Sequence, residues 1–109
     1  MTPNWEWRPA SDTTSVLAVH GELDVAVGDK FVKAVEEVLA AADPPKSVEI
    51  DLGRVEFIDS SGLRALLQVQ QAAPDVIRFG DLSPAVRRLL ELTGTLDHFG
   101  SGEGSDPDG

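Results

Sequence analysis

The chain has 109 residues, no cysteine and a formal net charge of −10, with 19 acidic against 9 basic residues. This length favours a single domain with one hydrophobic core, and the lack of cysteine excludes disulfides and thiolate metal sites. The acidic balance disfavours binding to nucleic acid or to anionic lipids, because both carry charge of the same sign. The lack of cysteine leads us to expect a cytoplasmic protein, and the charge leads us to expect one that contacts neither nucleic acid nor a membrane.

The first part of the chain predicts two strands and a helix. Residues 5–7 are typical of a short edge strand, and residues 16–20 of a compact strand that is closed by the turn 21–24. From Asp29 onward apolar residues recur at helical spacing, namely Phe31, Val32, Val35, Val38, Leu39 and Ala42. The proline pair at 44–45 ends that helix, because proline lacks the N–H that a helix interior needs.

The middle of the chain predicts a buried strand followed by a helix. Residues 47–52 alternate strictly between polar and apolar side chains, so one face of this strand lies on the core. Residues 53–54 are predicted to turn the chain, after which Phe57 and its apolar neighbours return to the interior. The next helix is predicted from near Ser60 to about Ala73.

The last part predicts a strand over residues 76–79 and one further helix. Ser83 is a good N-cap, Pro84 suits the first helical position, and Gly94 is a natural C-terminal stop. The predicted order is thus strand, strand, helix, strand, helix, strand, helix. Strands separated by helices need crossover connections, which favour parallel neighbours.

These elements predict the α/β class, with a mostly parallel central sheet of about four or five strands and helices packed on it. Leu96 and Phe99 are expected to pack against the domain in a final turn. Residues 100–109 hold no large apolar side chain, so they are expected to form a disordered acidic tail rich in Gly, Ser and Asp.

A polar junction lies where the buried strand meets the following helix, at Asp59-Ser60-Ser61-Gly62. The free N–H groups and the dipole of a helix start favour an anion or a phosphate there. Local physics alone favours simple helix capping by Asp59 or Ser60. Two observations favour a function: the junction holds more polar side chains than one cap needs, and Gly62 is a poor residue for a first turn unless a partner approaches the backbone closely.

A hydrolase is a weak alternative for this junction. A nucleophile elbow needs glycine two residues before the serine, and that position is Ile58. His20 lies within a strand pattern and His98 beside the tail, so neither is a convincing general base. No glycine-rich phosphate loop with a lysine is present. We therefore expect a protein that is not an enzyme and that needs no cofactor or metal.

Residues 52–63, Leu-Gly-Arg-Val-Glu-Phe-Ile-Asp-Ser-Ser-Gly-Leu, resemble the signature of the STAS domains of anti-sigma factor antagonists. Residues 21–24 are similar to the strand-to-helix turn of that family, and residues 82–94 to its last main helix. The resemblance is collinear over residues 16–99, and it implies a STAS domain that occupies residues 1–99.

The resemblance implies a binding module that is switched by phosphorylation. Such an antagonist binds an anti-sigma factor that is itself a serine kinase of the GHKL type, and this binding releases the sigma factor. The kinase then phosphorylates the first serine of the motif, here Ser60, and the complex separates; Ser61 is the second candidate acceptor. A PPM-type serine phosphatase removes the phosphate.

The resemblance also implies a partner-binding set, which consists of Asp24, Asp59, Ser60, Ser61 and Gly62. N-capping of the following helix is an equal alternative for Asp24. The chain departs from the family at Val27, where Thr or Ser is usual, and it is about three residues shorter between Gly62 and Ser83, roughly one helical turn. The alternative function is a STAS scaffold outside sigma regulation, or a small subunit of a lipid-transport complex.

Overall fold

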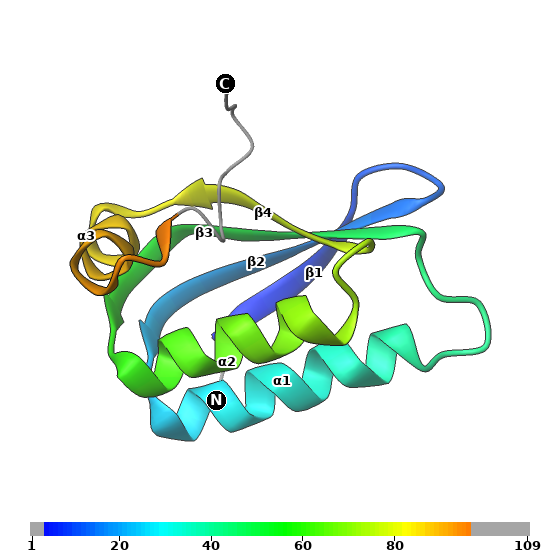
Figure 1. Ribbon diagram of the computed structural model, residues 1–109. Coiled ribbons are helices and arrows are strands. Elements are labelled where there is room, and N and C mark those ends of the chain that lie inside the picture. The colour runs from blue at the N-terminus through cyan, green and yellow to red at the C-terminus, as the bar shows by residue number, and fades with distance from the viewer. Residues whose placement is uncertain (1–3, 97–109) are drawn as a thin grey trace.

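The computed structural model describes residues 4–96. The strands are β1 (Trp5–Pro9), β2 (Thr14–Leu23), β3 (Ser47–Ile58) and β4 (Ile77–Leu82), and the helices are α1 (Val25–Leu39), α2 (Ser60–Ala72) and α3 (Pro84–Thr93) (Figure 1). The predicted α/β class and the predicted order of elements are confirmed. The expectations for His98, Phe99 and the tail 100–109 lie outside the described residues.

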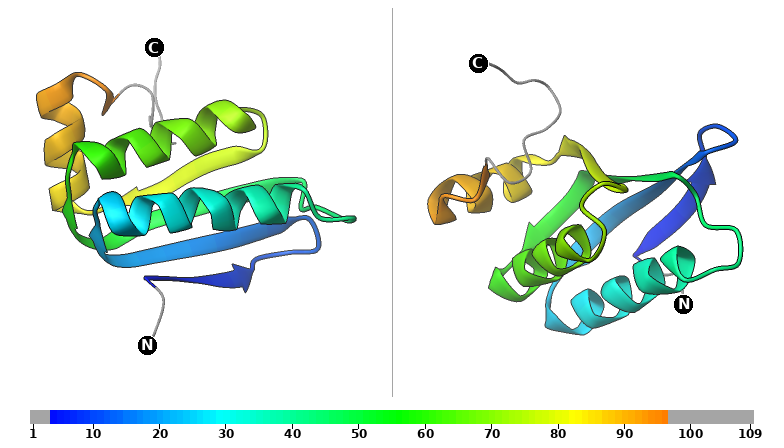
Figure 2. Two further views of the ribbon diagram at one scale, coloured as in Figure 1. Left: turned by 90° about the horizontal axis from the view of Figure 1, so that it is seen from below. Right: turned by 45° about the vertical axis from the view of Figure 1, so that its right-hand side comes forward.

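The sheet has four strands in the order β1-β2-β3-β4. β1 pairs antiparallel with β2, whereas β2–β3 and β3–β4 are parallel, so the expectation of a mostly parallel sheet is confirmed. Parallel neighbours need crossovers, and α1 and α2 supply them. These two helices lie side by side on one face of the sheet, while α3 lies at one end of β3 and β4 (Figure 2).

The core lies between the sheet and the helix pair. The alternation in β3 places Val48, Ile50 and Leu52 on this side, and all three side chains are fully buried. α1 and α2 contribute a further buried set, which includes Phe31, Val35, Leu66 and Val69. The edge strand joins the same core, because the ring of Trp5 packs edge-to-face on Phe31 with a centroid distance of 6.2 Å.

The start of the first helix differs from the sequence prediction. Periodicity placed it at Asp29, but α1 begins at Val25. The reason is the cap: the Asp24 carboxylate accepts the N–H of Val27 at 3.1 Å and so satisfies a free donor of the first turn. The first turn adds only one buried residue, Gly28, so it contributes little to the apolar pattern.

The predicted turn at residues 53–54 is also wrong, because β3 runs through it. In the pairing with β2, Ala18 lies opposite Asp51 but His20 lies opposite Arg54, which gives β3 one extra residue. A second extra residue follows, because Gly21 lies opposite Val55 and Glu22 opposite Phe57. Each bulge reverses the inward and outward alternation once.

The bulges explain why the prediction for Phe57 is wrong. After the first bulge Val55 faces the core and is 2% exposed. Plain alternation would then bring Phe57 inward, but the second bulge places Ile58 there instead. Phe57 is consequently 48% exposed.

Candidate functional site

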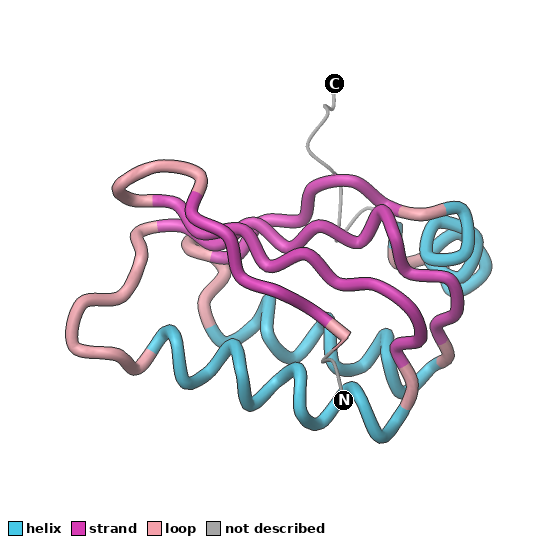
Figure 3. The backbone as a smooth tube through the Cα atoms, turned by 180° about the vertical axis from the view of Figure 1, so that it is seen from behind, coloured by secondary structure: helices cyan, strands magenta, loops and turns pink. Residues whose placement is uncertain are grey.

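The three strand-to-helix junctions of the sheet have the same local design. Each consists of a single residue, Asp24, Asp59 or Ser83, and the side chain of that residue caps the following helix. These short junctions gather at one end of the sheet, whereas the longer loops lie at the other end (Figure 3). The sequence therefore positions the helix starts tightly with respect to the strand ends.

Two of these junctions, those of α1 and α2, form the candidate site. Leu23 at the end of β2 pairs with Ile58 at the end of β3. The next residues, Asp24 and Asp59, therefore leave neighbouring strands at the same level, and α1 and α2 start beside each other (Figure 1). Asp24 thus lies beside the 59–62 junction in the fold.

Both carboxylates act as helix caps. Asp24 accepts the N–H of Val27, and Asp59 accepts the N–H of Gly62 at 3.0 Å. A cap of this kind contributes about 1 kcal/mol to stability. Both side chains remain half-buried, so each still presents part of its surface to solvent.

Ser60 is the exposed residue of the junction. It is the first residue of α2, and its hydroxyl makes no hydrogen bond to any residue in 4–96. Ser61 is half-buried and faces the groove between α1 and α2. Of the two serine hydroxyls, that of Ser60 is the more accessible to another protein.

Gly62 is required by the packing of this chain itself. A Cβ atom at this position would collide with the main-chain oxygen of Leu23 and would lie 2.9 Å from Cγ1 of Ile58. The first turn of α2 therefore passes directly against the ends of β2 and β3. Gly62 is buried, and the group that approaches it is the end of β2 and not a partner, which corrects the sequence interpretation of this glycine. Its place in the partner-binding set stays a prediction.

Two exposed apolar side chains flank the junction, and the sequence did not identify either as a surface residue. Val25, the first residue of α1, is 61% exposed, and Phe57, near the end of β3, is 48% exposed. The exposure of Phe57 depends on the bulges in β3, which leave no clear local signal in the sequence. Val25 was hidden because the helix was predicted to begin four residues later.

A groove of about 240 Å³ runs between α1 and α2 from this end. Its lining consists of Val25, Gly28, Asp29, Val32, Ser61, Arg64, Ala65 and Gln68. The helices approach closely here, since a Cβ atom on Gly28 would lie 3.3 Å from the Cβ of Ala65. Arg64 is exposed and forms no ion pair within residues 4–96, where the single ion pair joins Arg8 and Glu6.

His20, one of the two histidines of the chain, lies apart from Ser60. His20 lines a larger hollow of about 850 Å³, which also includes Arg54 and the start of α3 but neither serine of the junction. Within the described part of the chain, no group of three or more His, Asp or Glu side chains could hold a metal ion. None of the helices in residues 4–96 is long and apolar enough to cross a membrane.

The chain is similar to STAS-domain proteins in sequence and in fold. The family model described as "Mlab, STAS domain" matches residues 8–99. The anti-sigma-F factor antagonist RsfB of Mycobacterium tuberculosis is 33% identical over 82 residues, which cover 73% of this chain and 66% of RsfB. A crystal structure of an anti-sigma factor antagonist from Mycobacterium paratuberculosis has a TM-score of 0.73 at 31% identity, and the similarity covers 88% of this chain and 81% of that chain.

The fold is also that of SpoIIAA, an anti-sigma factor antagonist solved in two states. The unphosphorylated form has a TM-score of 0.63 at 22% identity, covering 84% of this chain and 81% of that one. The phosphorylated Bacillus form has a TM-score of 0.62 at 19% identity, covering 84% of each chain. The chain therefore belongs to the STAS-domain family, and RsfB and the M. paratuberculosis protein are two anti-sigma factor antagonists among its relatives.

Proposed function

We propose that this protein is an anti-sigma factor antagonist acting in the cytoplasm, which binds an anti-sigma factor serine kinase and is switched off by phosphorylation at Ser60. Binding would displace the sigma factor from the kinase. The observation that carries the proposal is the exposed hydroxyl of Ser60 at the start of α2, in a STAS chain with antagonists among its relatives. Ser61 is the second candidate acceptor, and its partial burial makes it the less accessible one.

The proposed partner is a kinase of the GHKL type, and the modification is a simple phosphoryl transfer. The Ser60 oxygen attacks the γ-phosphorus of ATP, the bond from that phosphorus to the β–γ bridging oxygen breaks, and ADP leaves with the electron pair of that bond. The serine proton passes to a base of the kinase or to water. A phosphatase of the PPM type then hydrolyses the phosphoserine and restores the hydroxyl. In both reactions the antagonist is a substrate, so it needs no catalytic group of its own.

The charge of the phosphate accounts for the release of the partner. Phosphorylation adds a charge of about −1.5 to −2 near pH 7. In the free chain the start of α2 tolerates this charge, because the helix dipole favours an anion there. In a complex the same group would be desolvated close to Asp24 and Asp59, in a molecule whose net charge is already −10. We therefore expect affinity to be lost while the fold is kept.

Val25 and Phe57 supply the apolar part of the proposed binding surface. Both are exposed although both are large and apolar, and both lie within two residues of an N-capping carboxylate. A surface with an apolar contact beside polar groups is typical of a protein interface. We propose that these two side chains, together with the predicted set Asp24, Asp59, Ser60, Ser61 and Gly62, contact the kinase.

Intact-mass measurement tests the proposal directly. The chain is incubated with ATP and the candidate anti-sigma kinase of its host, and the expected result is the mass gain of one phosphoryl group. The gain should be absent in Ser60→Ala and present in Ser61→Ala, which is the matched control at the neighbouring serine. Lack of phosphorylation by every anti-sigma kinase of the host would overturn the proposal.

A STAS scaffold or a small subunit of a lipid-transport complex is the alternative function. The observation in its favour is the description of the matching family model, which names Mlab and not an antagonist. This alternative requires no kinase and no change at Ser60. Purification of the tagged chain from its host separates the two functions: co-purification of an anti-sigma kinase supports the antagonist, and co-purification of transporter subunits supports the alternative.

A further inference from the structure

We infer that Arg64 pairs with the phosphoryl group on Ser60 and serves as its counter-charge within the same helix. The inference rests on the proposed function for the phosphorylation itself, and it identifies the residue that receives the phosphate. Arg64 is the single basic residue of α2, whose sequence is Ser-Ser-Gly-Leu-Arg-Ala-Leu-Leu-Gln-Val-Gln-Gln-Ala.

The helix places the two side chains within reach of each other. Ser60 and Arg64 are four residues apart in α2, so they lie on the same face with their Cβ atoms about 5–6 Å apart. Arg64 lines the groove between α1 and α2, and because side chains of a helix lean toward its N-terminus, its guanidinium can reach the turn that carries Ser60. Both residues are exposed, so a phosphate on Ser60 needs no rearrangement of the core to meet Arg64.

The charges around Arg64 leave it available. It forms no ion pair within the described chain, although Asp29 of α1 lines the same groove. The nearby Asp59 carboxylate already accepts the N–H of Gly62. A phosphoryl group carries up to about twice the charge of a carboxylate and has three acceptor oxygens, and guanidinium binds it in a bidentate manner. The phosphate on Ser60 should therefore outcompete Asp29 for Arg64.

This pairing gives phosphorylation a second effect on the binding surface. In the unphosphorylated chain Arg64 is a free cation four residues from the acceptor serine. After phosphorylation the same cation is engaged by the phosphate. The kinase-facing surface thus acquires an anion and loses the use of a cation in one step.

Phosphorus NMR tests the pairing without the kinase. Phosphoserine is incorporated at position 60 during translation, and the second pKa of the phosphate is measured by ³¹P titration in the wild-type background and in Arg64→Gln. A nearby cation favours the dianion, so Arg64 should hold this pKa below its ordinary value of about 6, and its removal should raise the pKa by about 0.3 or more. The difference should shrink in about 1 M salt, where the Debye length is about 3 Å.

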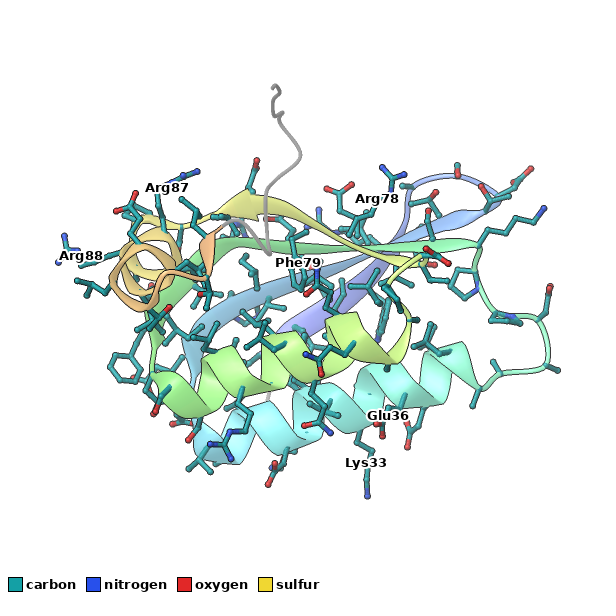
Figure 4. All side chains as sticks on the ribbon, in the orientation of Figure 1. Lys33, Glu36, Arg78, Phe79, Arg87 and Arg88 are labelled. Atoms are coloured by element: carbon teal, nitrogen blue, oxygen red, sulfur yellow. The ribbon has the colours of Figure 1, made fainter. Side chains whose placement is uncertain are left out.

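Arg78→Gln is the matched control, because Arg78 is an exposed arginine of β4 that points away from α1 and α2 (Figure 4). It removes the same charge and should leave the phosphate pKa unchanged, whereas Arg64→Lys should retain part of the effect. Equal pKa values in Arg64→Gln and Arg78→Gln would overturn the inference. The proposed function fails by a different result, the absence of kinase-dependent phosphorylation of the unmodified chain.

Discussion

The substitution Gly62→Ala probes the packing that holds the candidate site together. The added methyl group would collide with the main-chain oxygen of Leu23 and lie 2.9 Å from Cγ1 of Ile58 and 3.1 Å from the main-chain carbon of Leu23. Two of these three atoms belong to the backbone, so a side-chain rotation does not relieve the contact. Either the end of β2 or the start of α2 must move.

The expected cost follows from two opposing terms. Overpacking of a buried position costs about 1–3 kcal/mol, and a collision with backbone belongs at the upper end of that range. Alanine returns about 1 kcal/mol through its better helix propensity. The net loss is therefore about 2 kcal/mol in the free energy of unfolding, which lowers Tm by about 8 °C or more in a domain of this size.

Urea denaturation followed by circular dichroism measures this loss, with Gly28→Ala as the control. Gly28 is also a buried helical glycine, but its added Cβ would meet only the Cβ of Ala65 at 3.3 Å and the main-chain oxygen of Ser61 at 3.6 Å. The free energy of unfolding of Gly28→Ala should stay within about 1 kcal/mol of that of the wild type, because the gain in helix propensity offsets a mild steric contact. A Gly62→Ala variant as stable as Gly28→Ala would refute the reasoning.

Three further predictions concern the surface of the site, and isothermal titration calorimetry with the anti-sigma kinase measures the affinities. Ser60→Asp should weaken the complex while Ser60→Ala keeps it, and equal affinities would contradict the charge mechanism. Complete burial of a phenylalanine side chain contributes about 1.5–3 kcal/mol, and 48% of the Phe57 surface is exposed and available to a partner, so its contact is worth about half of that free energy. Phe57→Ala should therefore lower the affinity about 3- to 10-fold, whereas Leu92→Ala on α3 should have no effect. Asp24→Asn should keep the thermal stability, because asparagine also caps a helix, whereas Asp24→Ala should lose about 1 kcal/mol of stability. Weaker kinase binding by Asp24→Asn would show that the carboxylate charge contacts the kinase. Unchanged binding would show that Asp24 serves only as the helix cap.

The sequence was sufficient for the element order and for the end of the sheet at which the site lies. Strict alternation identified the buried side of residues 47–52, and capping residues marked the start of α2 and α3. It was not sufficient for β3 beyond Leu52, because a bulge is defined by the residue opposite it on the neighbouring strand. Phe57 was therefore assigned to the core although it lies on the surface.

Gly62 illustrates the same limit at the candidate site. The sequence interpretation was that a partner approaches the backbone at this glycine, because glycine is unfavourable in a helix. The approaching group is the end of β2, nearly forty positions earlier in the chain, and only the parallel pairing of β2 with β3 brings it there. An unfavourable residue at one position can indicate that a close contact exists, but the topology of the fold decides which part of the molecule makes that contact.

The paired bulges of β3 have a consequence for how this domain tolerates changes in chain length. From the partner of Ala18 to the partner of Leu23, β3 takes seven steps where β2 takes five, so the two bulges absorb two residues while Asp59 stays level with Asp24. Deletion of the extra residue of one bulge should therefore straighten the pairing at that point, with Ile58 still opposite Leu23 and Asp59 still level with Asp24. The level of Asp59 thus follows from the number of paired residues in β3, and the total number of residues in the strand does not fix it. The candidate site should therefore tolerate the loss of a bulge residue more readily than the loss of a paired residue of the same strand.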